Sequence, residues 1–201
     1  MIPKIIASGL LGYLIGSVVT AIIISRLVFR EDVRTQGSGN SGATNAARVY
    51  GLRFGVLTFL GDFLKGVAAC VLGRLIAGDA GLAAAGICCM AGHCFPVWFD
   101  FRGGKGVSVG AALALMIDWR IFVCAIAVFA IVVFAVKIVS VASLSATVTV
   151  GVMSLILGPV PILKALGAAA ALLVIFMHRT NIRRLILGTE KKIVFGRRGR
   201  K

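Results

Sequence analysis

The stretch Thr35–Arg48 carries residue types that bind anions. Its glycines leave backbone N–H groups open to a ligand, and a short helix beginning near Ala43 would direct its N-terminus at the same place. The arginine that closes the stretch can hold a phosphate through two parallel hydrogen bonds. A flexible polar loop is the alternative. The residues that we expect to bind phosphate are Ser38, Asn40, Gly42, Thr44, Asn45 and Arg48.

A second polar stretch, His93–Gly106, places glycines around Lys105 directly before an apolar segment that begins at Val107. A cation in a glycine-rich loop that leads into a helix is typical of a phosphate contact. The alternative is that these basic residues only mark the cytoplasmic side of a membrane. His93 can be catalytic or structural, and the sequence leaves both open. The phosphate contacts expected here are Arg102, Gly103, Gly104 and Lys105.

The third set of polar residues is split between two apolar segments. Ser140 and Ser143 are three residues apart, as are His178 and Asn181, so each pair shares one face of a helix. A histidine and an asparagine that point together at the end of an apolar segment indicate a site. We expect Ser143, His178 and Asn181 to form the catalytic centre together with Lys105.

The remaining ionisable residues do not form a metal site by sequence. Asp62 and Lys65, three residues apart in an apolar run, predict an ion pair that supports the site, as His93 does if it is structural. The other carboxylates are scattered along the chain, and the five cysteines fit the pattern of small buried hydrophobic residues. We therefore expect neither a metal nor a cofactor.

The composition places these residues in a membrane protein. Of 201 residues, 59% are hydrophobic and only 14% are charged, and the mean hydropathy is +1.02. Too few polar residues remain to cover a large aqueous domain, and the apolar content excludes intrinsic disorder. The net charge of +15 would indicate nucleic acid in a soluble protein, but here it first reports membrane topology.

Apolar runs of about 20 residues predict the membrane-spanning helices. The segment Val107–Val136 is ambiguous, because it can form one long helix or two short ones that turn at Asp118–Arg120. The other predicted spans are Ile5–Ser25, Phe54–Gly73, Ala80–Phe99, Ile138–Leu163 and Ala165–Met177.

Basic residues decide between these alternatives. Seventeen of the 22 lysines and arginines cluster in residues 26–53, 102–105, 137 and 179–201, and such clusters face the cytoplasm. The first and last clusters share a side only if two short helices fill Val107–Val136. The sequence therefore predicts an all-α integral membrane protein with seven transmembrane helices, an outside N-terminus and a cytoplasmic C-terminus. We expect one domain over residues 1–201 that ends in a short basic tail from about 185 to 201, and we expect Arg197–Lys201 to contact anionic lipids.

Anion-binding stretches on the cytoplasmic side of a membrane domain indicate a substrate with both a phosphate and an acyl chain. At these residues the sequence resembles the bacterial acyl-phosphate:glycerol-3-phosphate acyltransferases, the PlsY family. The resemblance covers essentially the whole chain. Its six ordered motifs are Ser38–Arg48, Gly61–Gly66, Gly92–Pro96, Phe101–Gly106, Lys137–Ser143, and His178–Arg184 with Gly188–Glu190.

The resemblance implies a bacterial inner-membrane enzyme of phospholipid synthesis that transfers a fatty acyl group from acyl phosphate to glycerol 3-phosphate. The products are lysophosphatidate and inorganic phosphate, and neither acyl-CoA nor an acyl carrier protein is the donor. Because acyl phosphate is already activated, we expect direct attack by the sn-1 hydroxyl, with the proton passing to His178 or to the departing phosphate. We expect no nucleic-acid ligand and no obligate protein partner. A transporter of phosphate-containing anions or lipids is the alternative.

The parity of the spans gives a first prediction. A reporter fused after Lys201 should be cytoplasmic, and one inserted near Asp79 should be external, because only this arrangement puts the basic clusters inside. Reporter accessibility in intact cells measures both. A cytoplasmic signal at Asp79 would contradict the seven-span topology.

Overall fold

The computed structural model describes residues 1–193, and these form helices joined by turns and loops, without a β-strand. Residues 194–201 lie outside the described residues, and with them the segment Arg197–Lys201 that is expected to contact lipids. The helices of the described residues are α1 (Ile2–Gly16), α2 (Thr20–Phe29), η1 (Val33–Thr35), α3 (Ala43–Tyr50), α4 (Leu52–Cys94), η2 (Val97–Phe99), α5 (Val107–Ile117), α6 (Trp119–Val136), α7 (Val139–Leu157), α8 (Pro161–Met177) and α9 (Arg179–Ile186).

Helix α4 is a hairpin of two antiparallel arms. Ala77 and Gly78 leave the helical conformation, and Gly78 takes a positive φ of 62°. On either side of this turn the arms touch, since a Cβ added to Gly73 would lie 2.3 Å from the carbonyl oxygen of Gly81. The two arms correspond to the two apolar runs that the sequence predicts on either side of Asp79.

The ambiguous segment Val107–Val136 forms two helices, as the distribution of basic residues requires. Helix α5 ends at Ile117, and Asp118 caps α6 by accepting a hydrogen bond from the backbone N–H of Arg120 at 2.8 Å. Eleven residues at about 1.5 Å each are too short to cross about 30 Å of hydrocarbon. Helix α5 is instead surrounded by protein, because it packs against α4, α6, α7 and α8.

Three predicted helix boundaries were wrong. The run Ala80–Phe99 extends past the end of α4 at Cys94. The run Ile5–Ser25 is not one helix, because α1 ends at Gly16 and α2 starts at Thr20 after a break. The run Ile138–Leu163 extends past the end of α7 at Leu157. Helix α8 begins at Pro161, where the missing N–H of proline costs nothing in the first turn of a helix.

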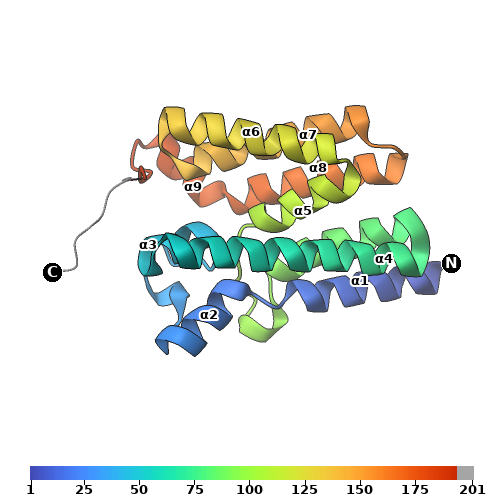
Figure 1. Cartoon of the computed structure of the whole chain (residues 1–201), viewed down its shortest axis with the longest axis horizontal. Helices are drawn as coiled ribbons and strands as arrows, with labels where there is room; N and C mark the ends of the chain where they lie inside the picture. The colour runs from blue at the N-terminus through green and yellow to red at the C-terminus, as the bar shows by residue number, and fades with distance from the viewer. Residues whose placement is uncertain (194–201) are drawn as a thin grey trace.

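The helices form two layers with α5 between them (Figure 1). Helices α1 and α4 make up one layer, and α6, α7 and α8 make up the other. The first layer is closely packed through glycines. A Cβ on Gly12 would lie 2.3 Å from the carbonyl oxygen of Ala85, and one on Gly16 would lie 2.1 Å from that of Cys89. Helix α1 can therefore approach α4 only with glycine at these positions.

By length and composition, four helical segments of the described residues can cross a bilayer: Ile2–Phe29, Leu52–Phe99, Trp119–Val136 and Val139–Leu157. A fifth is added if α8 and α9, bent by 56° at His178, form one span. Residues 1–193 thus confirm an all-helical architecture with several apolar helices long enough to span a membrane, whereas seven crossings and the orientation of the termini stay predictions.

Candidate active site

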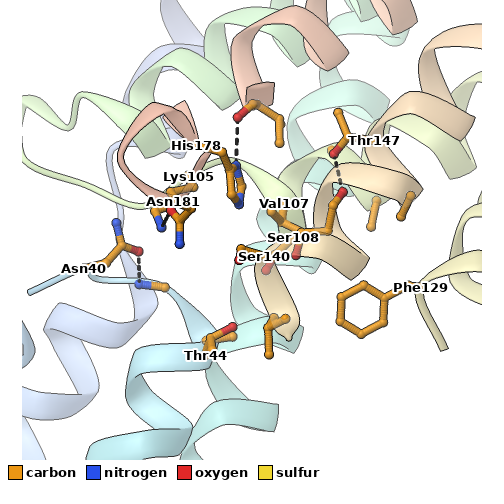
Figure 2. Close-up of a pocket in the computed structure, with 18 of the residues that line it drawn as sticks. Asn40, Thr44, Lys105, Val107, Ser108, Phe129, Ser140, Thr147, His178 and Asn181 are labelled. Carbon is orange, nitrogen blue, oxygen red and sulfur yellow. Dashed lines mark hydrogen bonds between the residues drawn. The ribbon is translucent and has the colours of Figure 1, made fainter. Parts of the chain in front are cut away.

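A cavity of about 560 Å³ joins the three polar stretches to the apolar interior. Figure 2 shows Asn40, Thr44, Lys105 and Asn181 gathered at its polar end, away from Phe129. Its apolar walls come from α5, α6, α7 and α8, where small residues such as glycine and alanine leave room between the helices. A single cavity therefore offers charged and apolar surroundings to different parts of one ligand.

Asn45 holds the glycine-rich loop in shape. Its amide nitrogen donates to the carbonyl oxygens of Val33 and Gln36, both at 3.1 Å, and its amide oxygen accepts from the N–H of Ser38 at 2.8 Å. Gly37 takes a φ of +65° and presses on this amide, where a Cβ would lie 2.2 Å from the amide oxygen. Both N–H donors of Asn45 are therefore used within the loop, in contrast to the direct phosphate contact that we expected.

A chain of hydrogen bonds connects Lys105 to the C-terminal segment. The ammonium of Lys105 donates to the amide oxygen of Asn181, whose amide nitrogen donates to Glu190 Oε1 at 2.6 Å. Ser140 donates to the same oxygen at 2.8 Å, and Arg184 Nε donates to Glu190 Oε2 at 2.6 Å. One carboxylate thus fixes residues from the start of α7, from α9 and, through Asn181, from the loop before α5.

The segment after α9 folds back to bring Glu190 into this position. Gly188 takes a φ of +67°, and the N–H of Thr189 donates to the carbonyl oxygen of Arg184 at 2.8 Å. The N–H of Ile193 then donates to the carbonyl oxygen of Lys137 at 2.7 Å, which fastens the segment to the turn between α6 and α7.

The surroundings of Lys105 make its ammonium easier to deprotonate than that of an exposed lysine. Burial, followed by repulsion from Arg184 and Arg48, lowers the pKa of Lys105 to about 8, although Glu190 acts in the opposite direction. Burial also raises the pKa of Glu190, but hydrogen bonds from Arg184, Asn181 and Ser140 outweigh it and leave this pKa lowered. A phosphate bound in the cavity would bring a negative charge close to Lys105 and so favour its charged ammonium form.

His178 stands at the bend between α8 and α9 and is 3% exposed. Its Nδ1 lies 2.8 Å from the carbonyl oxygen of Val174, as Figure 2 shows. A carbonyl oxygen can only accept, so Nδ1 carries the proton and the neutral ring keeps its lone pair on Nε2. This tautomer is the one that can accept a proton or a hydrogen bond from a ligand in the cavity.

The structure brings most of the expected site residues together. Those that line the cavity are Ser38, Asn40, Gly42, Thr44, Asn45, Arg48, His93, Lys105, Ser143, His178 and Asn181. Arg102, Gly103 and Gly104 do not line it. Arg102 is exposed and borders a separate hollow of about 270 Å³, because Arg34 holds its backbone through a hydrogen bond to its carbonyl oxygen.

Six polar residues that we did not propose also line the cavity: Ser108, Ser140, Thr147, Arg184, Glu190 and Lys191. Two of them carried a signal in the sequence. Ser140 shares a helix face with Ser143, and Glu190 is the one acidic residue among the nine basic residues of 179–201. Asp62 and Lys65 do not line the cavity, but they form the expected ion pair, with Lys65 Nζ 2.8 Å from Asp62 Oδ1.

Comparison with known proteins extends this picture. The family model "Glycerol-3-phosphate acyltransferase" matches residues 6–188. The chain belongs to this family. A glycerol-3-phosphate acyltransferase of Syntrophotalea carbinolica is 38% identical over 91% of this chain and 94% of its own, and one of Bradyrhizobium sp. strain BTAi1 is 42% identical over 92% of each.

This chain closely resembles two solved structures of PlsY (YgiH), an integral membrane glycerol 3-phosphate acyltransferase. The glycerol 3-phosphate form has a TM-score of 0.89 at 30% identity and covers 94% of this chain and 96% of its own. The lysophosphatidic acid form has a TM-score of 0.86 at 29% identity, with 94% and 95% covered. The family assignment from the sequence motifs is therefore confirmed.

The lowered pKa of Lys105 predicts a pH dependence. Below pH 8 the side chain is a cation that attracts phosphate, and above it the side chain becomes neutral. The kcat/KM for glycerol 3-phosphate should therefore fall above about pH 8, since kcat/KM reports the pKa of the free enzyme. The second ionisation of a phosphate monoester, near pH 6, lies below this range.

Two variants make this measurement specific. Lys105→Arg keeps its charge and should lose the basic limb, whereas Arg183→Ala removes a cation that does not line the cavity and should keep the limb. A wild-type profile that stays flat from pH 7 to 9.5, or an unchanged limb in Lys105→Arg, would contradict the assignment.

Proposed function

We propose that this protein transfers a fatty acyl group from acyl phosphate to the sn-1 hydroxyl of glycerol 3-phosphate, giving lysophosphatidate and inorganic phosphate. The observation that carries the proposal is the single cavity, which joins a cationic end to an apolar interior. Family membership and the glycerol 3-phosphate and lysophosphatidic acid forms of the solved relative support the same substrate class.

The two ends of the cavity bind different parts of the substrates. Lys105 and Arg48, with Thr44 and the loop Ser38–Gly42, bind the phosphates, and Asn45 keeps that loop in position. The apolar walls, including Phe129, receive the acyl chain. Burying methylene groups contributes about 0.8 kcal/mol each, so the chain binds well wherever such walls exclude water.

The reaction itself needs no enzyme nucleophile. The hydroxyl oxygen of glycerol 3-phosphate attacks the acyl carbonyl carbon, the bond from that carbon to the phosphate oxygen breaks, and phosphate leaves. The hydroxyl proton passes to His178 Nε2 or to the departing phosphate. Ser143 and Asn181 complete the centre, with Asn181 holding Lys105 near the developing negative charge.

Direct transfer is favoured over a covalent acyl-enzyme. His178 uses Nδ1 on its own helix, and no hydrogen bond joins Ser143 to His178 in residues 1–193. A serine nucleophile would need such an adjacent base. The acyl phosphate is a mixed anhydride, so proximity to the hydroxyl and stabilisation of negative charge suffice for rapid transfer.

The cavity and its position support a cytoplasmic site in a seven-span bacterial inner-membrane protein. The glycine-rich loop before α3, the turn between α6 and α7 and the folded-back segment that carries Glu190 lie at the same end of the molecule (Figure 1). Basic residues remain on the cytoplasmic side of a membrane, so this end faces the compartment in which glycerol 3-phosphate is found.

The choice of donor tests the proposal. Purified protein should release phosphate and form lysophosphatidate from palmitoyl phosphate and glycerol 3-phosphate, and it should form none from palmitoyl-CoA, because short loops offer no surface for a nucleotide. Lys105→Ala should lower the rate about 30- to 1,000-fold, the cost of losing one stabilising donor. Comparable rates with both donors, or near-normal activity of Lys105→Ala, would contradict it.

A further inference from the structure

Three ionisable side chains meet in the bundle beside the cavity: Asp62, Lys65 and His93. The ammonium of Lys65 lies 2.8 Å from Asp62 Oδ1, 3.1 Å from His93 Nδ1 and 2.6 Å from the carbonyl oxygen of Val18. Asp62 is fully buried and His93 is 2% exposed. An ammonium has three N–H donors, and these three acceptors use them all.

The cluster joins segments that are far apart in the sequence. Asp62 and Lys65 belong to the first arm of α4, and His93 belongs to the second arm. Val18 lies in the break between α1 and α2, where its carbonyl oxygen has no partner in a continuous helix. Thr20, at the start of α2, donates to Asp62 Oδ1 at 3.0 Å. The cluster therefore holds the break and the two arms together.

On its other side, His93 supports the loop that carries Lys105. Its carbonyl oxygen accepts from the N–H of Gly104 at 3.0 Å, and the carbonyl oxygen of Cys94 accepts from the N–H of Gly103 at 3.1 Å. Gly104 lies directly on the imidazole, since a Cβ there would be 2.1 Å from His93 Nε2. The position of the ring thus fixes the backbone next to Lys105.

We propose that Asp62, Lys65 and His93 are positioning residues, which set the place of the Lys105 ammonium in the cavity by bracing the loop Gly103–Lys105 through the His93 ring. Lys65 holds the ring at Nδ1 and leaves the Nε2 edge to contact Gly104. This inference rests on the proposed function of Lys105 as a phosphate ligand.

Stability alone does not account for the cluster. Replacing a buried ion pair with well-packed hydrophobic side chains of similar volume is often neutral or stabilising, whereas removing one partner leaves a buried charge unpaired. The double variant Asp62→Asn/Lys65→Met therefore removes the pair without an orphan charge. His93→Asn keeps an acceptor near Lys65 but removes the atoms that touch Gly104.

The test measures kcat and KM for glycerol 3-phosphate, with palmitoyl phosphate as donor, and the thermal unfolding midpoint of each variant. His93→Asn and the double variant should lose about 10- to 100-fold in kcat/KM, the cost of a misplacement of about 1 Å, while their folded yield stays near wild type. In a Lys105→Ala background, His93→Asn should cause little further loss, because the two residues act through one group.

Leu82→Ala serves as the control for destabilisation, because Leu82 is fully buried in α4 and does not line the cavity. It should lower the unfolding midpoint and leave KM unchanged. Full additivity of His93→Asn with Lys105→Ala, or wild-type kinetics in His93→Asn, would overturn the positioning role alone. Near-normal activity of Lys105→Ala would instead overturn the proposed function, so the two failures are distinguishable.

Discussion

The carboxylate of Glu190 is the interaction on which the geometry of the site depends. It accepts hydrogen bonds from Ser140, Asn181 and Arg184, and through Asn181 it reaches the ammonium of Lys105. These donors lie on two helices, α7 and α9. A negative charge among several cations lets them lie close together before a phosphate binds, and the charge-assisted hydrogen bonds are strong ones.

Pairing with a partner of opposite charge or with a hydrogen-bond acceptor also explains how the protein keeps charged residues inside the helical bundle. Beside the cavity, Lys65 forms an ion pair with Asp62 and contacts the His93 ring. Lys105 is partly buried, and this burial lowers its pKa. Polar groups in an apolar bundle are costly unless every donor has a partner. The hydrogen-bonded groups beside the cavity therefore hold one another in place, and Lys105, which lines the cavity, is available to the substrate.

Much of this architecture could be predicted from composition and spacing, because apolar runs and basic clusters are local properties of a sequence. The split of Val107–Val136 into two helices followed from the parity of the spans, and the Asp62–Lys65 pair followed from helical spacing. The break after Gly16 could not be found this way, since the carbonyl oxygen of Val18 that it exposes has its partner in Lys65, 47 residues away. The role of Asn45 was missed for the same reason, because its partners are backbone groups whose positions only the folded loop defines.

The central claim is that a Lys105 ammonium, held by Asn181 and Glu190, receives the phosphate of glycerol 3-phosphate. Calorimetry of glycerol 3-phosphate binding at pH 8.5, in buffers of different ionisation enthalpy, measures the protons taken up on binding. In the protein without ligand the pKa of Lys105 is about 8, and a bound anion raises it. The wild-type protein should therefore take up about half a proton or more on binding at pH 8.5, and Lys105→Met should take up none. Binding without proton uptake in the wild type, or the same uptake in Lys105→Met, would contradict this account of the site.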